Sequence, residues 1–172
     1  MIKIVNNFFD DEKYKKVMYH IKNNIYFTPR YFDELKEKTK ENYYGERFVL
    51  NSDKNFLNTF INQSEKKFNF KTKKLNHDCG IDLRNLDHFK PHVDTGLGKL
   101  NILIMLDGPI GVSTGTVFYT DNELDIHVGF RPNRAILFPS NYYHSQHKSE
   151  LKNIRRYTAS LFIEDYEETE EK

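Results

Sequence analysis

The chain has 172 residues, of which 38% are hydrophobic and 30% are charged, and its mean hydropathy is −0.74. These values fit one globular domain over residues 1–172 and exclude a membrane-embedded chain, because no apolar run has the length that a bilayer requires. A net charge of +1 gives no overall attraction to phosphate backbones, so we expect neither a membrane nor a nucleic-acid partner.

We expect no secretory signal at the start of the sequence. Residues 1–9 contain neither a long apolar segment nor a small-residue cleavage site, so we expect a cytoplasmic protein. Cys79, the single cysteine, excludes an internal disulfide and suits a reducing compartment. Its expected role is that of a small buried residue.

Two helices are predicted in the front half of the chain. In residues 11–24, apolar side chains recur at the i, i+3, i+4, i+7 spacing of one helical face, behind a cap at Asp10 or Asp11. Residues 53–68 repeat this spacing behind a cap at Ser52-Asp53. We expect the apolar face of the second helix to cover a sheet.

Two polar segments flank the second helix. Residues 32–44 are rich in Lys and Glu, and their weak apolar face indicates either a helix or a mobile lid within residues 28–46. Lysines at positions 66–74 interleave with Phe68 and Phe70. We favour a solvated strand or helix end there over a polyanion contact.

From Cys79 onward the sequence predicts short antiparallel strands, because β-branched and aromatic runs alternate with Gly, Pro, Asn and Asp. The runs cover residues 79–84, 100–106, 116–120, 124–130, 134–138 and 156–163. The fold class is α+β, a cupin-like double-sheet jelly roll with N-terminal helices packed on one sheet. Residues 1–78 would form a helical front with supporting strands, residues 79–163 the jelly-roll core, and residues 164–172 an acidic, frayed and solvated tail.

Candidate metal ligands lie in the jelly-roll core. Residues two apart on an extended strand project to the same face, so His92 and Asp94 can offer a nitrogen and an oxygen to one metal ion. The third ligand must come from a distant strand, and a turn after Pro139 delivers His144. We favour it over His147, which lies in a polar run typical of an exposed loop. Two imidazoles and one carboxylate are the protein ligands of a type of Fe(II) site in which other coordination positions of the ion stay open.

A candidate anion site follows on the last strand. Arg156 and Thr158 alternate onto one face with Ser160, and a guanidinium beside a hydroxyl suits a carboxylate. Arg155, on the opposite face, is the weaker candidate. The alternative is a solvated strand face that carries a surface arginine. Candidates for the pocket mouth, which ordinary packing explains equally well, are Tyr43, Tyr44, Arg47, Tyr142 and Tyr143.

Five short motifs follow one another in this half of the chain. They are residues 89–94, residues 100–107, residues 114–119, residues 133–139 with His144, and Arg156-Tyr157-Thr158. Together their order and spacing resemble the 2-oxoglutarate and Fe(II)-dependent dioxygenases. Among these they look closest to the small prolyl-hydroxylase-like members of bacteria and their viruses, over residues 79–163.

This resemblance implies a double-stranded β-helix in which His92, Asp94 and His144 hold iron and are catalytic. Arg156 would bind the distal carboxylate of 2-oxoglutarate, with Thr158 assisting. The implied cofactor is Fe(II) and the implied cosubstrate is 2-oxoglutarate, with ascorbate as a further candidate. The implied reaction hydroxylates a protein or small-molecule substrate, for example a peptidyl proline, and releases succinate and CO2.

One departure from the family pattern concerns a loop. Many relatives carry Gly-Gly before the fifth-strand aromatic residue, whereas this chain has Ser113-Thr114-Gly115, which puts the loop geometry in question. Two other functions stay open. A cupin-like metalloenzyme would use the same ligands without a 2-oxo acid, and a non-catalytic jelly-roll binding module would use the histidines structurally. Succinate release and Fe(II) binding distinguish the three.

Overall fold

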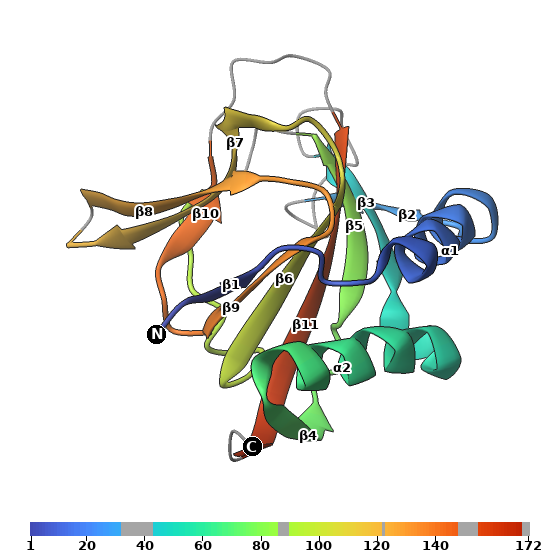
Figure 1. Cartoon of the computed structure of the whole chain (residues 1–172). Helices are drawn as coiled ribbons and strands as arrows, with labels where there is room; N and C mark the ends of the chain where they lie inside the picture. The colour runs from blue at the N-terminus through green and yellow to red at the C-terminus, as the bar shows by residue number, and fades with distance from the viewer. Residues whose placement is uncertain (32–42, 86–89, 122, 148–154, 170–172) are drawn as a thin grey trace.

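The computed structural model describes residues 1–31, 43–85, 90–121, 123–147 and 155–169 (Figure 1). Within them the chain forms two antiparallel sheets and two α-helices. The helix or lid expected over residues 32–44 falls mainly on residues 32–42, which lie outside the described part of the chain.

Both predicted helices are confirmed, and each begins after an aspartate cap. α1 (Asp11–Asn23) follows Asp10, whose carboxylate accepts a hydrogen bond from a backbone N–H of the first turn at 2.8 Å. α2 (Lys54–Phe68) follows Asp53, which accepts from the N–H of Phe56 at 3.0 Å. These caps satisfy donors that have no partner within the helix. Neither helix of the described ranges has the length and apolar character needed to cross a bilayer.

The helices pack their apolar faces against the larger sheet. Ile21 of α1 and Phe60 of α2 share one buried cluster with Ile102 and Leu161 of the sheet, and each of the four is at most 1% exposed. Burying such a side chain contributes roughly 1.5–3 kcal/mol, so this layer stabilises both the helices and the sheet. Figure 1 shows α2 crossing in front of β11. The prediction that the second helix covers a sheet is confirmed.

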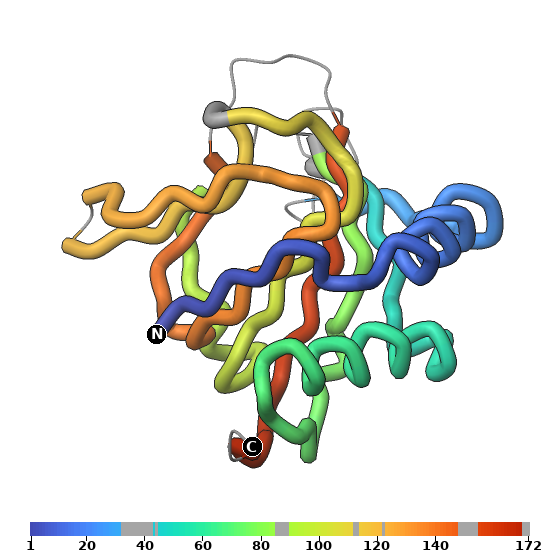
Figure 2. The backbone as a smooth tube through the Cα atoms, in the orientation of Figure 1, coloured from blue at the N-terminus to red at the C-terminus, as the bar shows by residue number. Residues whose placement is uncertain are grey.

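The larger sheet has eight strands in the order β1-β9-β6-β11-β5-β3-β2, with β4 paired to β11 off this path. Their bounds are β1 Lys3–Val5, β2 Thr28–Tyr31, β3 Tyr43–Val49, β4 Phe70–Leu75, β5 Gly80–Asn85, β6 Leu100–Asp107, β9 Arg134–Pro139 and β11 Arg155–Glu168. A 3-10 turn, Leu50–Ser52, joins β3 to the cap of α2. Figure 2 traces β11, in red, through the sheet to the C-terminal end. The last strand is therefore central, with β5 and β6 on either side.

The smaller sheet has three strands in the order β10-β7-β8. Their bounds are β7 Gly111–Thr120, β8 Glu123–Phe130 and β10 His144–Gln146. A second buried cluster joins the two sheets, with Phe118 from the smaller and Met105 and Phe138 from the larger. The predicted α+β double-sheet jelly roll is thus confirmed, as are the six strand runs from Cys79 onward.

The tail predicted at residues 164–172 is not frayed in its described part, although residues 167–169 are exposed to solvent as expected. β11 continues to Glu168 and pairs with β4 from Ile163 opposite Leu75 to Glu168 opposite Phe70. Its acids meet lysines in ion pairs, Lys74–Glu164 at 2.5 Å, Lys99–Asp165 at 2.7 Å and Lys73–Glu167 at 3.1 Å. The acidic segment is ordered because the lysine-rich strand lies beside it, and residues 170–172 lie outside the described ranges.

Candidate functional site

Two histidines far apart in the sequence face each other across a short antiparallel bridge. The backbone N–H of His92 donates to the carbonyl of His144, and the N–H of His144 donates to the carbonyl of His92, both at 2.9 Å. Their rings lie 4.5 Å apart. The expected extended strand at His92 is therefore only this isolated bridge, which still places the two side chains together.

Asp94 completes the cluster. Its backbone N–H donates to the carbonyl of Ser140 at 2.8 Å, which ties it to the turn before His144. His92, Asp94 and His144 each offer one ligand atom, and these atoms lie within 4.8 Å of one another. The structure thus brings together the three residues selected from the sequence.

The two imidazoles are oriented in the same way. The Nδ1 atom of His92 contacts the carbonyl of Lys90 at 2.9 Å, and that of His144 contacts the carbonyl of Tyr142 at 2.9 Å. Because a carbonyl only accepts, these contacts favour the tautomer with hydrogen on Nδ1 and the lone pair on Nε2. The two Nε2 atoms lie 3.7 Å and 3.4 Å from the Asp94 carboxylate. Burial lowers the pKa of His144, which favours the neutral form that binds metals.

His147 lies elsewhere. Its ring stacks on that of His127 with centroids 4.7 Å apart, and its backbone N–H donates to the carbonyl of Gly115 at 3.0 Å. The ring of His127 in turn contacts the carbonyl of Thr114 at 3.1 Å. The preference for His144 over His147 therefore agrees with the cluster that the structure forms.

A cavity of about 210 Å³ opens beside the three residues. Arg156, Thr158 and Ser160 of β11 line it, whereas Ala159 and Leu161 belong to the helix-covered core. The alternation predicted for this strand is confirmed. It places the candidate arginine and the candidate metal ligands in one cavity.

Arg156 is a buried cation, only 4% exposed. Its Nη1 donates to the carbonyl of Gly115 at 3.1 Å, and its guanidinium lies 5.6 Å from the centre of the Phe130 ring. Among the described residues Nε has no hydrogen-bond partner, and no carboxylate forms an ion pair with the side chain. Burial, and then the charge of Arg84, lower the pKa of Arg156 to about 9. An anion in the cavity would offset this desolvation.

The neighbouring Arg155 differs in each respect. Its side chain is 48% exposed and lies 3.8 Å from the carboxylate of Glu46. It does not line the cavity. The structure therefore separates the two arginines as the strand alternation predicts.

Gly115 resolves the question about the loop geometry. Its backbone has φ of +130°, and a Cβ there would lie 2.2 Å from the carbonyl oxygen of Val128. Only glycine fits this close approach of β7 to β8. The same residue presents its carbonyl to Arg156. The Thr114 hydroxyl lies 3.1 Å from the carbonyl oxygens of Pro109 and Gly111 and can donate its one hydrogen to either.

Sequence reasoning missed three buried polar residues of this site. Thr116 and Gln146 lie opposite each other in the smaller sheet and line the cavity, and neither Thr116 Oγ1 nor Gln146 Nε2 has a hydrogen-bond partner among the described residues. Asn101 of β6 donates from Nδ2 to Asp94 Oδ2 at 2.6 Å. An asparagine within the apolar run of residues 100–106 is a signal that could have identified it.

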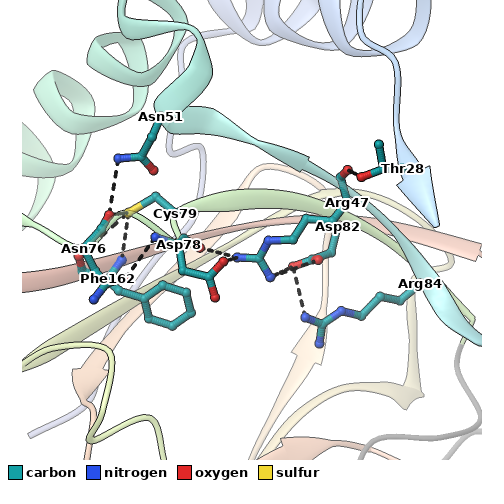
Figure 3. A network of polar contacts seen from close by, with 9 residues as sticks. All are labelled: Thr28, Arg47, Asn51, Asn76, Asp78, Cys79, Asp82, Arg84 and Phe162. Atoms are coloured by element: carbon teal, nitrogen blue, oxygen red, sulfur yellow. Dashed lines mark hydrogen bonds and ion pairs between the residues drawn. The ribbon is translucent and has the colours of Figure 1, made fainter. Parts of the chain in front are cut away.

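A charged wall closes the side of the cavity formed by β3 and β5 (Figure 3). The buried carboxylate of Asp82 lies between two guanidinium groups, with Arg47 Nη1 at 3.3 Å and Arg84 Nη2 at 3.0 Å. Arg47 also donates to the carbonyl of Asp78 and lies over Gly80, where a Cβ would meet Nε at 2.5 Å. Arg47 thus lines the cavity as a buried wall residue.

The tyrosines proposed for the pocket mouth behave differently from Arg47. Tyr43, Tyr142 and Tyr143 are not among the lining residues, and the side chain of Tyr44 lies outside the described part. Tyr142 accepts a hydrogen bond from the N-terminal amine at 2.9 Å. Local packing therefore accounts for the described tyrosines.

No family model matches the chain, and no curated protein matches it. Solved structures with a similar fold include HygX from Streptomyces hygroscopicus with nickel and 2-oxoglutarate bound. Its TM-score is 0.67 at 9% identity, over 98% of this chain and 83% of that one. A Pseudomonas putida prolyl-4-hydroxylase has a TM-score of 0.61 at 10% sequence identity, over 95% of this chain and 92% of that one. A third similar structure is a Trichoplax adhaerens prolyl hydroxylase in complex with a hypoxia inducible factor oxygen degradation domain peptide fragment. Its TM-score is 0.60 at 14% sequence identity, over 95% of this chain and 83% of that one.

At these identities the comparison establishes the fold. The chain has the double-stranded β-helix fold of 2-oxoglutarate and Fe(II)-dependent oxygenases. This fold is the one that the motif resemblance implies.

Proposed function

We propose that the protein is a non-haem Fe(II) oxygenase that couples oxidative decarboxylation of 2-oxoglutarate to hydroxylation of a substrate. One observation carries the proposal. Two imidazoles and a carboxylate converge beside a cavity that also holds a buried arginine with no carboxylate partner among the described residues. The first group suits a ferrous ion, and the second suits a 2-oxo dicarboxylate.

The three ligands fit Fe(II) by their chemistry and orientation. Two nitrogens and one oxygen leave open positions on an octahedral ion, as oxygenases of this type require. The carbonyl contacts of both Nδ1 atoms leave the Nε2 lone pairs available to a metal. We therefore assign His92, Asp94 and His144 as the iron ligands and catalytic residues.

The cavity fits the cosubstrate through its unsatisfied polar groups. Arg156 Nε and Gln146 Nε2 are buried donors that have no hydrogen-bond partner among the described residues. The buried hydroxyl of Thr116 also has no hydrogen-bond partner among these residues. A buried donor without a partner costs about 1–3 kcal/mol, which a bound carboxylate would relieve. We propose that Arg156 binds the distal carboxylate of 2-oxoglutarate, that Thr158 assists, and that Thr116 and Gln146 complete this subsite.

The chain's own residues supply binding, orientation and shelter. Bound iron would supply the oxidative decarboxylation in which 2-oxoglutarate and O2 give succinate and CO2, with the second oxygen atom of O2 transferred to the hydroxylated product. Arg156 would fix the far end of the cosubstrate from the rigid centre of the larger sheet. Leu103, Phe138 and Phe162 line the apolar part of the cavity and would limit access of water to the reacting atoms.

The direct test is succinate production by protein loaded with Fe(II) under anaerobic conditions and then given 2-oxoglutarate and oxygen. We expect turnover that falls to background in His92→Ala and Asp94→Ala. His20→Ala is the matched control, because this histidine of α1 lies 4.0 Å from Asp53 and does not line the cavity. Loss of turnover in the control as well would trace the effect to the fold.

The same preparation separates the alternatives. Metal binding without succinate release would favour a cupin-like enzyme that uses no 2-oxo acid. Absence of metal binding would favour a non-catalytic binding module.

For the substrate we propose a peptidyl residue such as proline, because two of the compared enzymes are prolyl hydroxylases. A panel of proline-containing peptides should raise succinate release above the rate without peptide, with hydroxyproline as the product. If no peptide stimulates an active preparation, a small-molecule substrate is favoured instead.

A further inference from the structure

Asn101 is the polar partner of the candidate ligand Asp94. It lies on β6 at 3% exposure, and its Nδ2 donates to Asp94 Oδ2 at 2.6 Å. A carboxylate only accepts hydrogen bonds, so the amide nitrogen must be the atom that faces Asp94. The amide oxygen, Oδ1, is then directed away from Asp94.

The amide oxygen distinguishes Asn101 from an asparagine that serves only the fold. Asn133 is also buried, but both ends of its amide bind the backbone of Phe9, each at 2.9 Å. In Asn101, Oδ1 has no hydrogen-bond partner among the described residues, and the residue lines the cavity. A buried carbonyl oxygen without a partner is costly, so this position is suited to a donor inside the cavity, such as a water molecule.

The contact also makes the two oxygens of Asp94 different. Oδ2 accepts the hydrogen bond from Asn101 and lies 3.4 Å from His144 Nε2. Oδ1 lies 3.7 Å from His92 Nε2 and receives no hydrogen bond from the described residues, so all of its lone pairs are available to an ion. The backbone of Asp94 is fixed by Ser140 and Leu97, each at 2.8 Å, but those contacts do not restrict rotation of the carboxylate. In the described part of the chain, the amide of Asn101 is the group that hydrogen-bonds this side chain.

We propose that Asn101 is a positioning residue that orients Asp94 for metal binding and leaves Oδ1 as the oxygen offered to the ion. The inference rests on the proposed metal site and adds to it a residue that contacts no metal. Without the amide, the carboxylate could rotate or turn both oxygens toward the ion. The metal would then bind more weakly and in an altered ligand geometry.

The test measures metal binding rather than turnover. Wild type, Asn101→Leu and Asn101→Ser are titrated anaerobically with Co(II), and the dissociation constant and the visible ligand-field spectrum are recorded. Leucine keeps the volume and removes the donor, whereas serine keeps a hydroxyl that can donate directly or through water. We expect about 10- to 100-fold weaker binding and an altered spectrum for Asn101→Leu, with partial recovery for Asn101→Ser.

Asn133→Ala is the matched control for loss of a buried amide. It should lower the stability of the fold and leave the Co(II) affinity and spectrum unchanged. An Asn101→Leu variant with wild-type affinity and spectrum overturns the inference alone. A wild type that binds metal but releases no succinate contradicts the proposed function and leaves the comparison of variants valid. A wild type that binds no metal overturns both.

Discussion

The buried guanidinium of Arg156 yields the sharpest quantitative prediction. Arg156→Met removes the charge but keeps an apolar stem against Phe130, so the cavity wall should persist. The wild-type side chain is 4% exposed and has a free Nε among the described contacts, so it can meet a carboxylate with charge-assisted hydrogen bonds. Losing one partner of such a buried pair costs about 2–5 kcal/mol. The dissociation constant for 2-oxoglutarate should therefore rise from about 30-fold to several thousand-fold.

The assay is calorimetric binding of 2-oxoglutarate to the anaerobic metal-loaded protein. Arg155→Met is the matched control, since that neighbour is 48% exposed and its pair with Glu46 is of the surface kind that contributes little. It should bind 2-oxoglutarate as wild type does. Metal affinity should be unchanged in both variants. Wild-type binding of 2-oxoglutarate by Arg156→Met, or an equal loss in Arg155→Met, would refute the assignment of the anchor.

Three further predictions concern the scaffold. Gly115→Ala places a Cβ 2.2 Å from a backbone oxygen and should cost on the order of 1–3 kcal/mol in denaturant unfolding, whereas Gly96→Ala, with nothing within 4 Å, should cost nothing. Tyr166→Ala removes a ring whose centre lies 6.2 Å from that of Phe70 and should lower the free energy of unfolding by about 1–2 kcal/mol. An unchanged free energy of unfolding would instead indicate that this segment is frayed in solution. Burial raises the pKa of Cys79 from 9.0 to about 11, so a thiol reagent should label only unfolded protein at neutral pH. Since the unfolded thiol loses its proton first, stability should fall as pH rises between these values; labelling of native protein at the unfolded rate would contradict the burial.

The sequence predicted the helices and core strands because their signals are local. A cap followed by apolar residues at helical spacing marks α1 and α2 without knowledge of any neighbour. The pairing of His92 with Asp94 is also local, since a single residue separates them in the sequence. Their convergence with His144 depends on one backbone bridge between distant segments, which the family pattern indicated and the structure forms.

The features that the sequence did not yield depend on partners from elsewhere in the chain. The strand or helix end predicted for residues 66–74 is confirmed, since α2 ends at Phe68 and β4 follows, but the pairing of β4 with the acidic end of β11 was not predicted. Each of these two strands lies beside charges that complement its own. Thr116 and Gln146 are ordinary polar residues until the register of β7 and β10 sets them opposite each other in the cavity. Single-sequence patterns carry little information about such cross-strand pairs.

The central claim is that three distant side chains bind one ferrous ion beside an arginine that holds a 2-oxo acid. A crystal structure soaked anaerobically with Fe(II) and an unreactive 2-oxoglutarate analogue tests it most directly. We predict metal density bonded to His92, Asp94 and His144, with the distal carboxylate of the analogue on Arg156. Metal bound elsewhere, or an analogue whose carboxylate avoids Arg156 in a fully loaded crystal, would contradict the account.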